Sequence, residues 1–505
     1  MSRVKYVAKN IAFGYVGNLV STVMGFVLRT VFIMNLDMTL LGVDGLYGSV
    51  LTVLSLAELG IGTAMNFSLY KPVAEGNREK IKSYMQLYKK AYFIIAGVVC
   101  LIGLAIAPFL SFIIKEPGVI SRSELTIYYF VFLFNTVSTY FVAYKYSLVN
   151  AQQKNYIQTN ILTVSKLLTT VAQVIVILVT KSFLLYLLSA AVIELAQKIF
   201  ANYYLNQLYP YLLEKNVTKL TKEETRPIIE NTKALIYHKV GDVARLQTDN
   251  IIISTFINVT LVGYISNYNM VLTAVSGFVN IIFNSVLSSF GNLIATETKE
   301  KQYQMFRVYK FLAAWIYGLS AIGFYYLLSP FIALCWGEDM VLGGAIVACI
   351  LTDYYFKGLR IVQSNFKTAA GVFAADQYLA LIQGAVNLVI SIILVQKIGL
   401  VGVYIGTITS GLIANFTKPY LIYKICFEKS VVGYYRESAG YLLVLLLSAV
   451  AIYPIASYFA QTLSAKGFLV VFFAILVVVN AIYYFFFHKS QEFLYLKSLI
   501  LKKRG

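Results

Sequence analysis

The chain has 505 residues, of which 59% are hydrophobic and only 13% are charged, whereas a soluble globular domain carries roughly 25% charged residues. This composition excludes a soluble domain and predicts an all-α polytopic membrane protein. The formal net charge of +19 would suggest a nucleic-acid partner in a soluble chain. Here the lysines and arginines gather between apolar stretches, as they do in cytoplasmic membrane loops, so no nucleic-acid partner is expected.

The basic start MSRVKYVAKN runs directly into the first apolar stretch, so we expect that stretch to remain as an anchor helix rather than a cleaved signal. Because a spanning helix needs ~20 mainly apolar residues, the sequence predicts fourteen transmembrane helices. The predicted spans are 10–34, 45–70, 91–114, 125–150, 157–180, 182–206, 232–256, 261–287, 308–330, 339–362, 374–396, 399–422, 437–460 and 467–488.

The basic residues alternate between successive connections. With both termini inside, 33 of the 42 lysines and arginines fall on the inner side, which predicts that both termini are cytoplasmic. The longest polar interruption separates six spans from eight. We therefore predict an N-lobe at 1–213, a cytoplasmic connecting loop at 214–231, a C-lobe at 232–425, two appended helices within 436–490 and a basic cytoplasmic tail at 491–505.

A short internal repeat supports two pseudo-symmetric six-helix lobes. The segments EKIKSYMQLYK (79–89) and EKQYQMFRVYK (300–310) share EK and YK at the same spacing, 221 residues apart. Both are predicted to lie along the lipid headgroups as amphipathic segments before the next helix enters the membrane. The repeats would run parallel, related by an axis along the membrane normal, and the offset makes Arg29 equivalent to Asn250.

The first predicted span carries Asn18 and Arg29 among apolar residues. An ionisable side chain at membrane depth is costly and usually marks function. Arg29 has two interpretations: it lines a polar cavity, or its long side chain extends to the outer interface. Glu58, in the middle of the second span, has three: a protonatable coupling site, the counter-ion of Arg29, or a residue that holds the turn of a glycine-rich helix.

The seventh predicted span places His238, Asp242, Arg245 and Asp249 at steps of four, three and four residues. That spacing puts all four on one helix face. So polar a face must meet water or partners within the bundle rather than lipid. The alternative is that Asp242, Arg245 and Asp249 neutralise one another in a packed core.

Three further groups of charged residues lie in predicted spans. Lys166 is an isolated cation. Asp353, Lys357 and Arg360 are spaced four and three apart, again on one face, although that face runs toward the cytoplasmic end, where cations are expected anyway. Glu194 and Lys198, four residues apart, are most simply an intrahelical pair.

Enzyme and metal motifs are missing from the sequence. The four cysteines and two histidines form no metal-binding spacing, and GxxxxGK[ST], HExxH and GxSxG are absent. We therefore expect no metal, no cofactor and no enzymatic activity.

Longer segments are similar to a known family. RTVFIMNLDMTLLGVDGLYGSVLTVLSLAELGIGTAMNFSLYKPVAEGNREKIKSYMQLYKKAY (29–92), TDNIIIS (248–254), SNYNMV (266–271) and FNSVLSSFGNLIATETKEK (283–301) resemble Wzx-type oligosaccharide or polysaccharide flippases of the MOP superfamily, in versions from Gram-positive bacteria. The resemblance implies a MATE-like carrier of two lobes in the bacterial plasma membrane. Such a carrier moves an undecaprenyl-diphosphate-linked oligosaccharide from the inner to the outer leaflet by alternating access. Membrane lipids, a polysaccharide polymerase and glycosyltransferases are the implied partners.

A cargo of this kind has a diphosphate, which calls for arginine or lysine, and a glycan, which calls for amides, hydroxyls and carboxylates. The diphosphate candidates are Arg29, Lys166, Arg245, Lys357 and Arg360. The candidates for the polar cavity or for energy coupling are Asn18, Glu58, His238, Asp242, Asp249, Asn250 and Asp353.

Three other functions stay open. A peptidoglycan-precursor flippase makes the same electrostatic demand as the first reading, since its lipid also carries a diphosphate. A MATE-like antiporter of cationic drugs would share the fold but favour unpaired acidic residues in its cavity. An integral-membrane glycosyltransferase or polymerase would use similar lipids but needs catalytic carboxylates or histidines. The sequence identifies neither the sugar nor the ion or potential that drives transport.

Overall fold

The structure is a computed structural model that describes residues 3–58, 61–214, 216–372, 374–376, 378–460 and 464–502. All regular secondary structure within these ranges is helical. Ten of the helices described there are long and apolar enough to cross a membrane. Each of the fourteen predicted spans overlaps at least one helix. The prediction of an all-α polytopic membrane protein is therefore confirmed, and the helices are consistent with fourteen spans.

The chain divides into two compact units, Met1–Gly263 and Tyr264–Gly505. The predicted lobe boundaries at 213 and 232 stay a prediction. The helices of the first unit, the last of which continues into the second, are α1 (Arg3–Asn35), α2 (Met38–Leu54), α3 (Ile61–Ala74), α4 (Arg78–Ile106), α5 (Leu110–Ile113), α6 (Arg122–Ala151), α7 (Asn155–Thr180), α8 (Phe183–Leu208), α9 (Lys222–Leu246), α10 (Thr248–Phe256) and α11 (Val259–Thr296).

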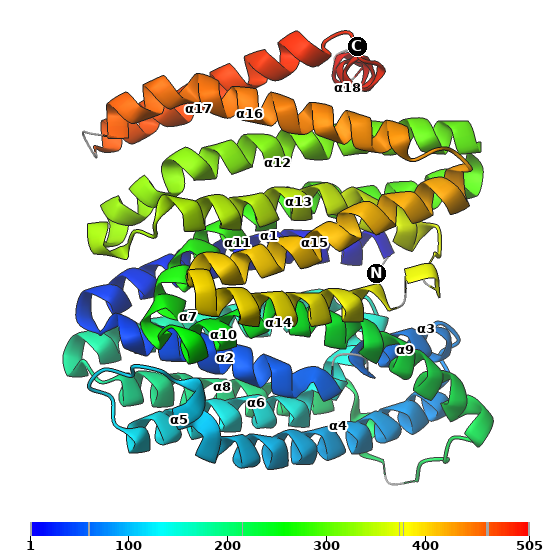
Figure 1. The fold of residues 1–505 in the computed structure, drawn as a ribbon. Coiled ribbons are helices and arrows are strands. Elements are labelled where there is room, and N and C mark those ends of the chain that lie inside the picture. The colour runs from blue at the N-terminus through cyan, green and yellow to red at the C-terminus, as the bar shows by residue number, and fades with distance from the viewer. Residues whose placement is uncertain are drawn as a thin grey trace. The chain divides into compact units, whose positions relative to one another are not determined.

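Within the first unit, α1 packs along α7, α7 along α8, and α6 against both α4 and α8 (Figure 1). Aromatic rings fill the space between these helices: Tyr47 of α2 stacks edge-on against Tyr129 of α6, and its hydroxyl donates to the Leu125 carbonyl at 2.8 Å. Buried tyrosines of this kind combine a large apolar surface with one satisfied hydroxyl. These tyrosines stabilise the packing of helices whose inward side chains include many polar ones.

The helices differ from the predicted spans at three places. The span expected at 45–70 is two helices, because α2 ends at Leu54 and α3 begins at Ile61. The span expected at 232–256 is interrupted at Gln247, between α9 and α10. The expected interfacial segments at 79–89 and 300–310 are wrong as separate elements, since each forms the first turns of a long continuous helix, α4 or α12.

The amino-terminal ends of α2 and α11 cross at very close range. A Cβ added to Gly263 of α11 would lie 2.7 Å from the Met38 carbonyl and 3.0 Å from the Gly42 nitrogen, and one added to Gly42 would meet the Val259 carbonyl. Beside the glycines, the Thr39 and Thr260 hydroxyls are 3.0 Å apart. Small residues permit this backbone approach, as is common between membrane helices.

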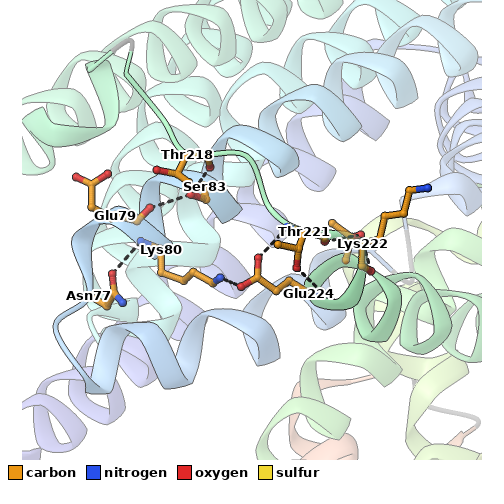
Figure 2. A network of polar contacts seen from close by, with 9 residues as sticks. Asn77, Glu79, Lys80, Ser83, Thr218, Thr221, Lys222 and Glu224 are labelled. Atoms are coloured by element: carbon orange, nitrogen blue, oxygen red, sulfur yellow. Dashed lines mark hydrogen bonds and ion pairs between the residues drawn. The ribbon is translucent and has the colours of Figure 1, made fainter.

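The segment that joins α8 to α9 is fastened to the start of α4 (Figure 2). The Ser83 hydroxyl donates to the Thr218 carbonyl at 2.6 Å, and Lys80 forms an ion pair with Glu224. Glu224 also completes a capping box with Thr221 at the start of α9. Because capping groups and an ion pair act together here, the beginnings of α4 and α9 are held to one another.

The second unit holds α12 (Lys299–Trp336), α13 (Gly344–Ala369), α14 (Leu379–Ile398), α15 (Leu400–Ile422), α16 (Val432–Ala460), α17 (Ala465–Phe487) and α18 (Gln491–Lys502). Figure 1 shows α12 beside α13, and α16 beside α17. Arg307 of α12 pairs with Glu437 of α16 at 3.0 Å and with Glu492 of α18 at 2.8 Å. The predicted basic tail at 491–505 is therefore helical over α18 and is tied to α12 by its acidic residue.

Candidate functional site

The first unit encloses a cavity of about 1140 Å³, larger than the usual range of roughly 300–1,000 Å³ for small-molecule sites. We call it the central cavity. Its walls come from α1, α2, α3, α6, α7 and α8, together with Tyr92 of α4. Helices of one compact bundle therefore supply the whole lining.

Amides and hydroxyls dominate the polar part of the lining. Asn18 and Ser21 come from the first helix, and Asn18 is a cavity residue that the sequence predicts. The others are spread over α3, α6, α7 and α8: Asn66, Asn135, Thr139, Ser147, Asn150, Gln158, Thr159, Thr163, Ser165, Thr169, Gln173 and Gln197. Neutral donors and acceptors of this type can hydrogen-bond sugar hydroxyls without a charge.

Five charged side chains line the central cavity: Asp44, Glu58, Lys166, Glu194 and Lys198. Asp44 lies within Coulombic range of both Arg29 and Lys166. Arg29 itself is half-buried in α1 and interacts with Asp44 and with the cavity residue Tyr186. One acidic group thus lies within Coulombic range of two of the predicted diphosphate candidates, which the structure brings to the same region of the bundle.

Glu58 lies at the break between α2 and α3, directly after the 3-10 turn Ser55–Ala57. Its carboxyl lies within hydrogen-bonding reach of the hydroxyls of Tyr92 and Tyr140, while the Tyr140 hydroxyl donates its proton to Ser55 Oγ at 2.9 Å. The position of Glu58 agrees with the interpretation that it holds a turn. Because Glu58 also lines the central cavity, a role as a protonatable coupling site stays a prediction.

Lys198 lies within Coulombic range of Glu194, as expected for an intrahelical pair. Its ammonium also reaches across to α6, where it donates to the Asn135 carbonyl and to Ser138 Oγ, both at 2.8 Å. The lysine is buried. It therefore connects α8 to α6 at the wall of the central cavity in addition to pairing along its own helix.

The polar group predicted on the seventh span is divided by the interruption at Gln247. Asp242 and Arg245 lie in α9, and Asp249 and Asn250 in α10, with Gln247 between the two helices in a right-handed helical conformation. Asp242 is exposed, and the buried Nε of Arg245 has no hydrogen-bond partner among the described residues. Asn250 donates to Ser49 of α2 at 2.9 Å.

Neither Arg245 nor the α10 residues belong to the lining of the central cavity. The side chain of His238 lies outside the described residues. The helices α9 and α10 nevertheless belong to the same unit as Arg29 and Lys166. In that unit α9 packs against α3, and α10 packs against α2.

In the second unit, Asp353, Lys357 and Arg360 come together on one face of α13, as their spacing predicts. Asp353 lies 2.5 Å from Lys357 and 3.9 Å from Arg360. Arg360 also donates to the Gly411 carbonyl of α15 at 2.5 Å. Asp353 and Arg360 are buried and Lys357 is exposed. One carboxylate thus balances two cations where α13 packs on α15.

Asp44 is a charged cavity residue that the sequence interpretation missed. The predicted second span began at residue 45, which left Asp44 in a connection. In the structure α2 begins at Met38, because Asp37 caps it by accepting from the Thr39 nitrogen at 2.7 Å. An aspartate just before an apolar run is a recognised helix-start signal, and applying it would have placed Asp44 inside the helix.

Comparison with known proteins gives the family and the fold. The polysaccharide biosynthesis protein family matches residues 7–288, which is more than half of the chain. No curated protein matches it. Several solved structures share the fold at low sequence identity.

A structure of the lipid II flippase MurJ, in an inward closed conformation, aligns with a TM-score of 0.67 at 13% identity, over 95% of this chain and 99% of that one. An inward-facing multidrug resistance MATE transporter of the MOP superfamily gives 0.61 at 14%, over 80% and 94%. The Vibrio cholerae MATE transporter VcmN in the bent form gives 0.52 at 13%, over 84% and 98%.

At these identities the likeness shows the fold, which is the MATE-like helical fold that the sequence predicts. The sequence resemblance to Wzx-type flippases of the MOP superfamily is confirmed by the family match. The solved structures that share this fold are those of membrane transporters. The chain belongs to the polysaccharide biosynthesis protein family.

Proposed function

We propose that this protein is a flippase that carries an undecaprenyl-diphosphate-linked oligosaccharide from the inner to the outer leaflet of a bacterial plasma membrane, with both termini cytoplasmic, for surface polysaccharide synthesis. The observation that carries the proposal is the lining of the central cavity, which joins a wall of amides and hydroxyls to Lys166 and to the neighbouring Arg29. The description of the matched family supports it.

The three parts of such a cargo differ in what they need. The isoprenoid tail can stay in lipid, so only the glycan and the diphosphate have to enter a polar passage. The neutral wall suits sugar hydroxyls. Arg29 and Lys166 suit phosphate oxygens, with arginine able to make a forked hydrogen bond. Arg245 is a further proposed phosphate ligand, since its buried Nε is a donor without a partner among the described residues.

Lys357 and Arg360 stay proposed contacts for the diphosphate, with the exposed Lys357 as the accessible one of the two. Glu58, Asp242, Asp249, Asn250, His238 and Asp353 stay proposed polar or coupling residues, with Asn18 in the cavity lining. A polysaccharide polymerase and glycosyltransferases are proposed partners, because they would consume and supply a cargo of this class.

A second candidate, export of organic cations, has one observation in its favour. Asp44, Glu58 and Glu194 line the same central cavity, and a cationic drug would need acidic groups of that kind. The lysines in the lining and Arg29 beside it oppose this candidate, because Asp44 already has two cations within Coulombic range.

The test is transport by the purified protein in vesicles. A short-chain lipid diphosphate that carries an oligosaccharide, and a quaternary ammonium dye, serve as separate cargoes. We expect the lipid to be flipped and the dye to be excluded. Dye transport without any effect on the lipid would overturn the flippase proposal.

Variants then test the proposed phosphate contacts. Arg29→Ala and Lys166→Ala should each reduce lipid flipping about tenfold or more, since each removes a charged hydrogen-bond donor. The matched control is Lys71→Ala, which removes an exposed cation from α3 whose Glu75 partner is 3.9 Å away. Normal flipping by both cavity variants would contradict the phosphate assignment and leave the family membership intact.

A further inference from the structure

A second cavity in the first unit, of about 1190 Å³, is lined by α4, α6, α8 and the segment that follows α8. We call it the lateral pocket. Its charged residues are Lys82, Lys89, Lys90, Lys145, Lys198 and Glu214. Five lysines against one glutamate leave an excess of four positive charges. A concentration of one sign in a concave site focuses the potential and attracts a ligand of the opposite sign.

Two of these charges hold the pocket together. Lys82 is buried and pairs with Glu79 at 2.5 Å and with Glu214 at 2.7 Å. Because Glu214 belongs to the segment after α8, this ion pair fixes that segment as one wall of the pocket, near the contacts drawn in Figure 2. The lysines left to meet a ligand are Lys89, Lys90, Lys145 and Lys198.

Lys145 is the most informative of the four. Its side chain is 4% exposed, and its Nζ donates to Asn202 Oδ1 and Asn206 Oδ1, both at 2.5 Å. Both acceptors are neutral, and within the described parts of the chain no carboxylate pairs with Lys145. Lys89 lies within Coulombic range of it. Buried charges are normally paired with an opposite charge, so the buried Lys145, with the exposed Lys89 nearby, favours an anionic ligand at this wall of the pocket.

Apolar side chains make up much of the remaining wall, beside the polar Gln86, Ser138, Tyr144, Asn202 and Asn206. Phe93 is 46% exposed, Ile94 67% and Ile199 62%, and all three line the pocket together with Phe141. A free inorganic anion would gain nothing from such a wall. An amphiphile gains from both parts, because its charged group can meet the lysines while its chains cover the exposed apolar side chains.

We propose that the lateral pocket binds the phosphate headgroup of a membrane lipid, with the phosphate among Lys89, Lys90 and Lys145 and the chains against Phe93, Ile94 and Ile199. The ligand chemistry is a phosphate ester that carries long apolar chains. A bulk anionic phospholipid and an isoprenoid diphosphate both have it. Lys198 and Val142 line both the lateral pocket and the central cavity, so a headgroup bound here lies directly beside the central cavity.

The site does not depend on the proposed cargo, because a structural phospholipid would occupy it equally well. The experiment measures lipid binding to the purified full-length protein by native mass spectrometry in detergent. The probes are phosphatidylglycerol, phosphatidylcholine with the same chains, farnesyl diphosphate and inorganic phosphate. We expect phosphatidylglycerol or farnesyl diphosphate to bind well above phosphatidylcholine, and inorganic phosphate to compete only weakly.

The comparison between the two anionic probes identifies the source of the ligand. Preference for farnesyl diphosphate assigns the pocket to the isoprenoid lipid, and preference for phosphatidylglycerol assigns it to a bulk phospholipid. Preferential binding of farnesyl diphosphate would support the lateral pocket even if the protein does not flip the lipid in the transport assay. The pocket proposal and the flippase proposal can therefore fail separately. Equal binding of phosphatidylglycerol, farnesyl diphosphate and phosphatidylcholine would overturn the inference, as would inorganic phosphate displacing the lipid at equal concentration.

The matched variants carry the same change of charge. Lys89→Gln with Lys90→Gln alters two exposed lysines of the pocket and should weaken anionic lipid binding about tenfold or more. Lys219→Gln with Lys222→Gln alters two exposed lysines outside the pocket and should leave binding unchanged. An equal loss in both pairs would mean diffuse attraction by surface charge and would overturn the site. Thermal melting of each variant confirms that the protein is folded.

Discussion

The hydroxyl oxygens of Thr39 and Thr260 lie 3.0 Å apart although the two residues are separated by 221 positions in the chain. The same separation relates Gly42 to Gly263, which also meet at the crossing of α2 and α11. It is the offset of the EK and YK repeat in the sequence. Two pairs of residues separated by the repeat offset therefore contact one another within the first unit.

The crossing of α2 and α11 predicts a clear difference between two glycines of α2. Gly42→Ala places a methyl group against the Val259 carbonyl and should destabilise the fold by about 1–3 kcal/mol, as overpacking does. Gly48→Ala meets nothing within 4 Å and should be neutral or slightly stabilising, because alanine favours a helix over glycine. Thermal melting in detergent measures both. Equal melting temperatures for the two variants would contradict the close crossing.

The threonine contact can be trapped covalently. In a background in which Cys100, Cys335, Cys349 and Cys426 are replaced by alanine, Thr39→Cys with Thr260→Cys should form a disulfide under mild oxidation. If this crossing separates during alternating access, the oxidised protein should stop transporting and recover on reduction.

Transport assays before and after reduction check this prediction, with Thr39→Cys alone as the control. Full transport by the crosslinked protein would show that α2 and α11 stay together throughout the cycle.

Because Asp44 lies within Coulombic range of Arg29 and Lys166, we expect their effects on cargo binding to be coupled. Arg29→Gln and Asp44→Asn should each change cargo affinity, and the double variant should lose less than the sum of the two. Groups that interact directly are not additive in a double-mutant cycle. Binding of the short-chain lipid diphosphate measures the coupling. Strict additivity would mean that Asp44 does not act on Arg29.

In the second unit, Lys367 and Asp376 form a buried ion pair. Lys367→Met leaves the carboxylate of Asp376 buried without its partner and should cost about 3–5 kcal/mol of stability. The double variant Lys367→Met with Asp376→Leu should recover most of that loss, since neither charge remains. Chemical denaturation in detergent measures both variants.

The control for this pair is Lys299 with Glu428, which are 2.5 Å apart but exposed to 56% and 70%. Lys299→Met should leave stability unchanged within error, because water replaces the lost partner. If Lys367→Met were as harmless as Lys299→Met, the burial of the Lys367 pair would be in doubt.

The sequence was sufficient for features that depend on local composition. Long apolar runs predict helices because every backbone group must be satisfied within the membrane, and each predicted span overlaps a helix. Asn18 and Lys166 were found as cavity residues because polar side chains at membrane depth are rare enough to stand out. The helix α13 brings Asp353, Lys357 and Arg360 together because one unbroken helix preserves their spacing.

The missing parts depend on where helices begin and break. Asp44 was overlooked because the apolar scan began α2 too late, although Asp37 marks its start. The interruption at Gln247 was not expected, because nothing in the spacing of Arg245 and Asp249 indicates it. The lateral pocket was not predicted, because its lysines come from segments far apart in the sequence. Each of them alone resembles the ordinary lysines of a cytoplasmic loop.

The segment between α8 and α9 lies where the sequence predicts that two lobes join, and a junction of that kind is a place usually chosen for cutting or extending a chain. Here Ser83, Lys80 and Lys82 of α4 each contact it or the start of α9. A reporter inserted there, or a gene split into two separately expressed halves, would remove a brace from the first half. The better insertion points are therefore exposed turns away from α4, and the connection should be handled as part of the first half.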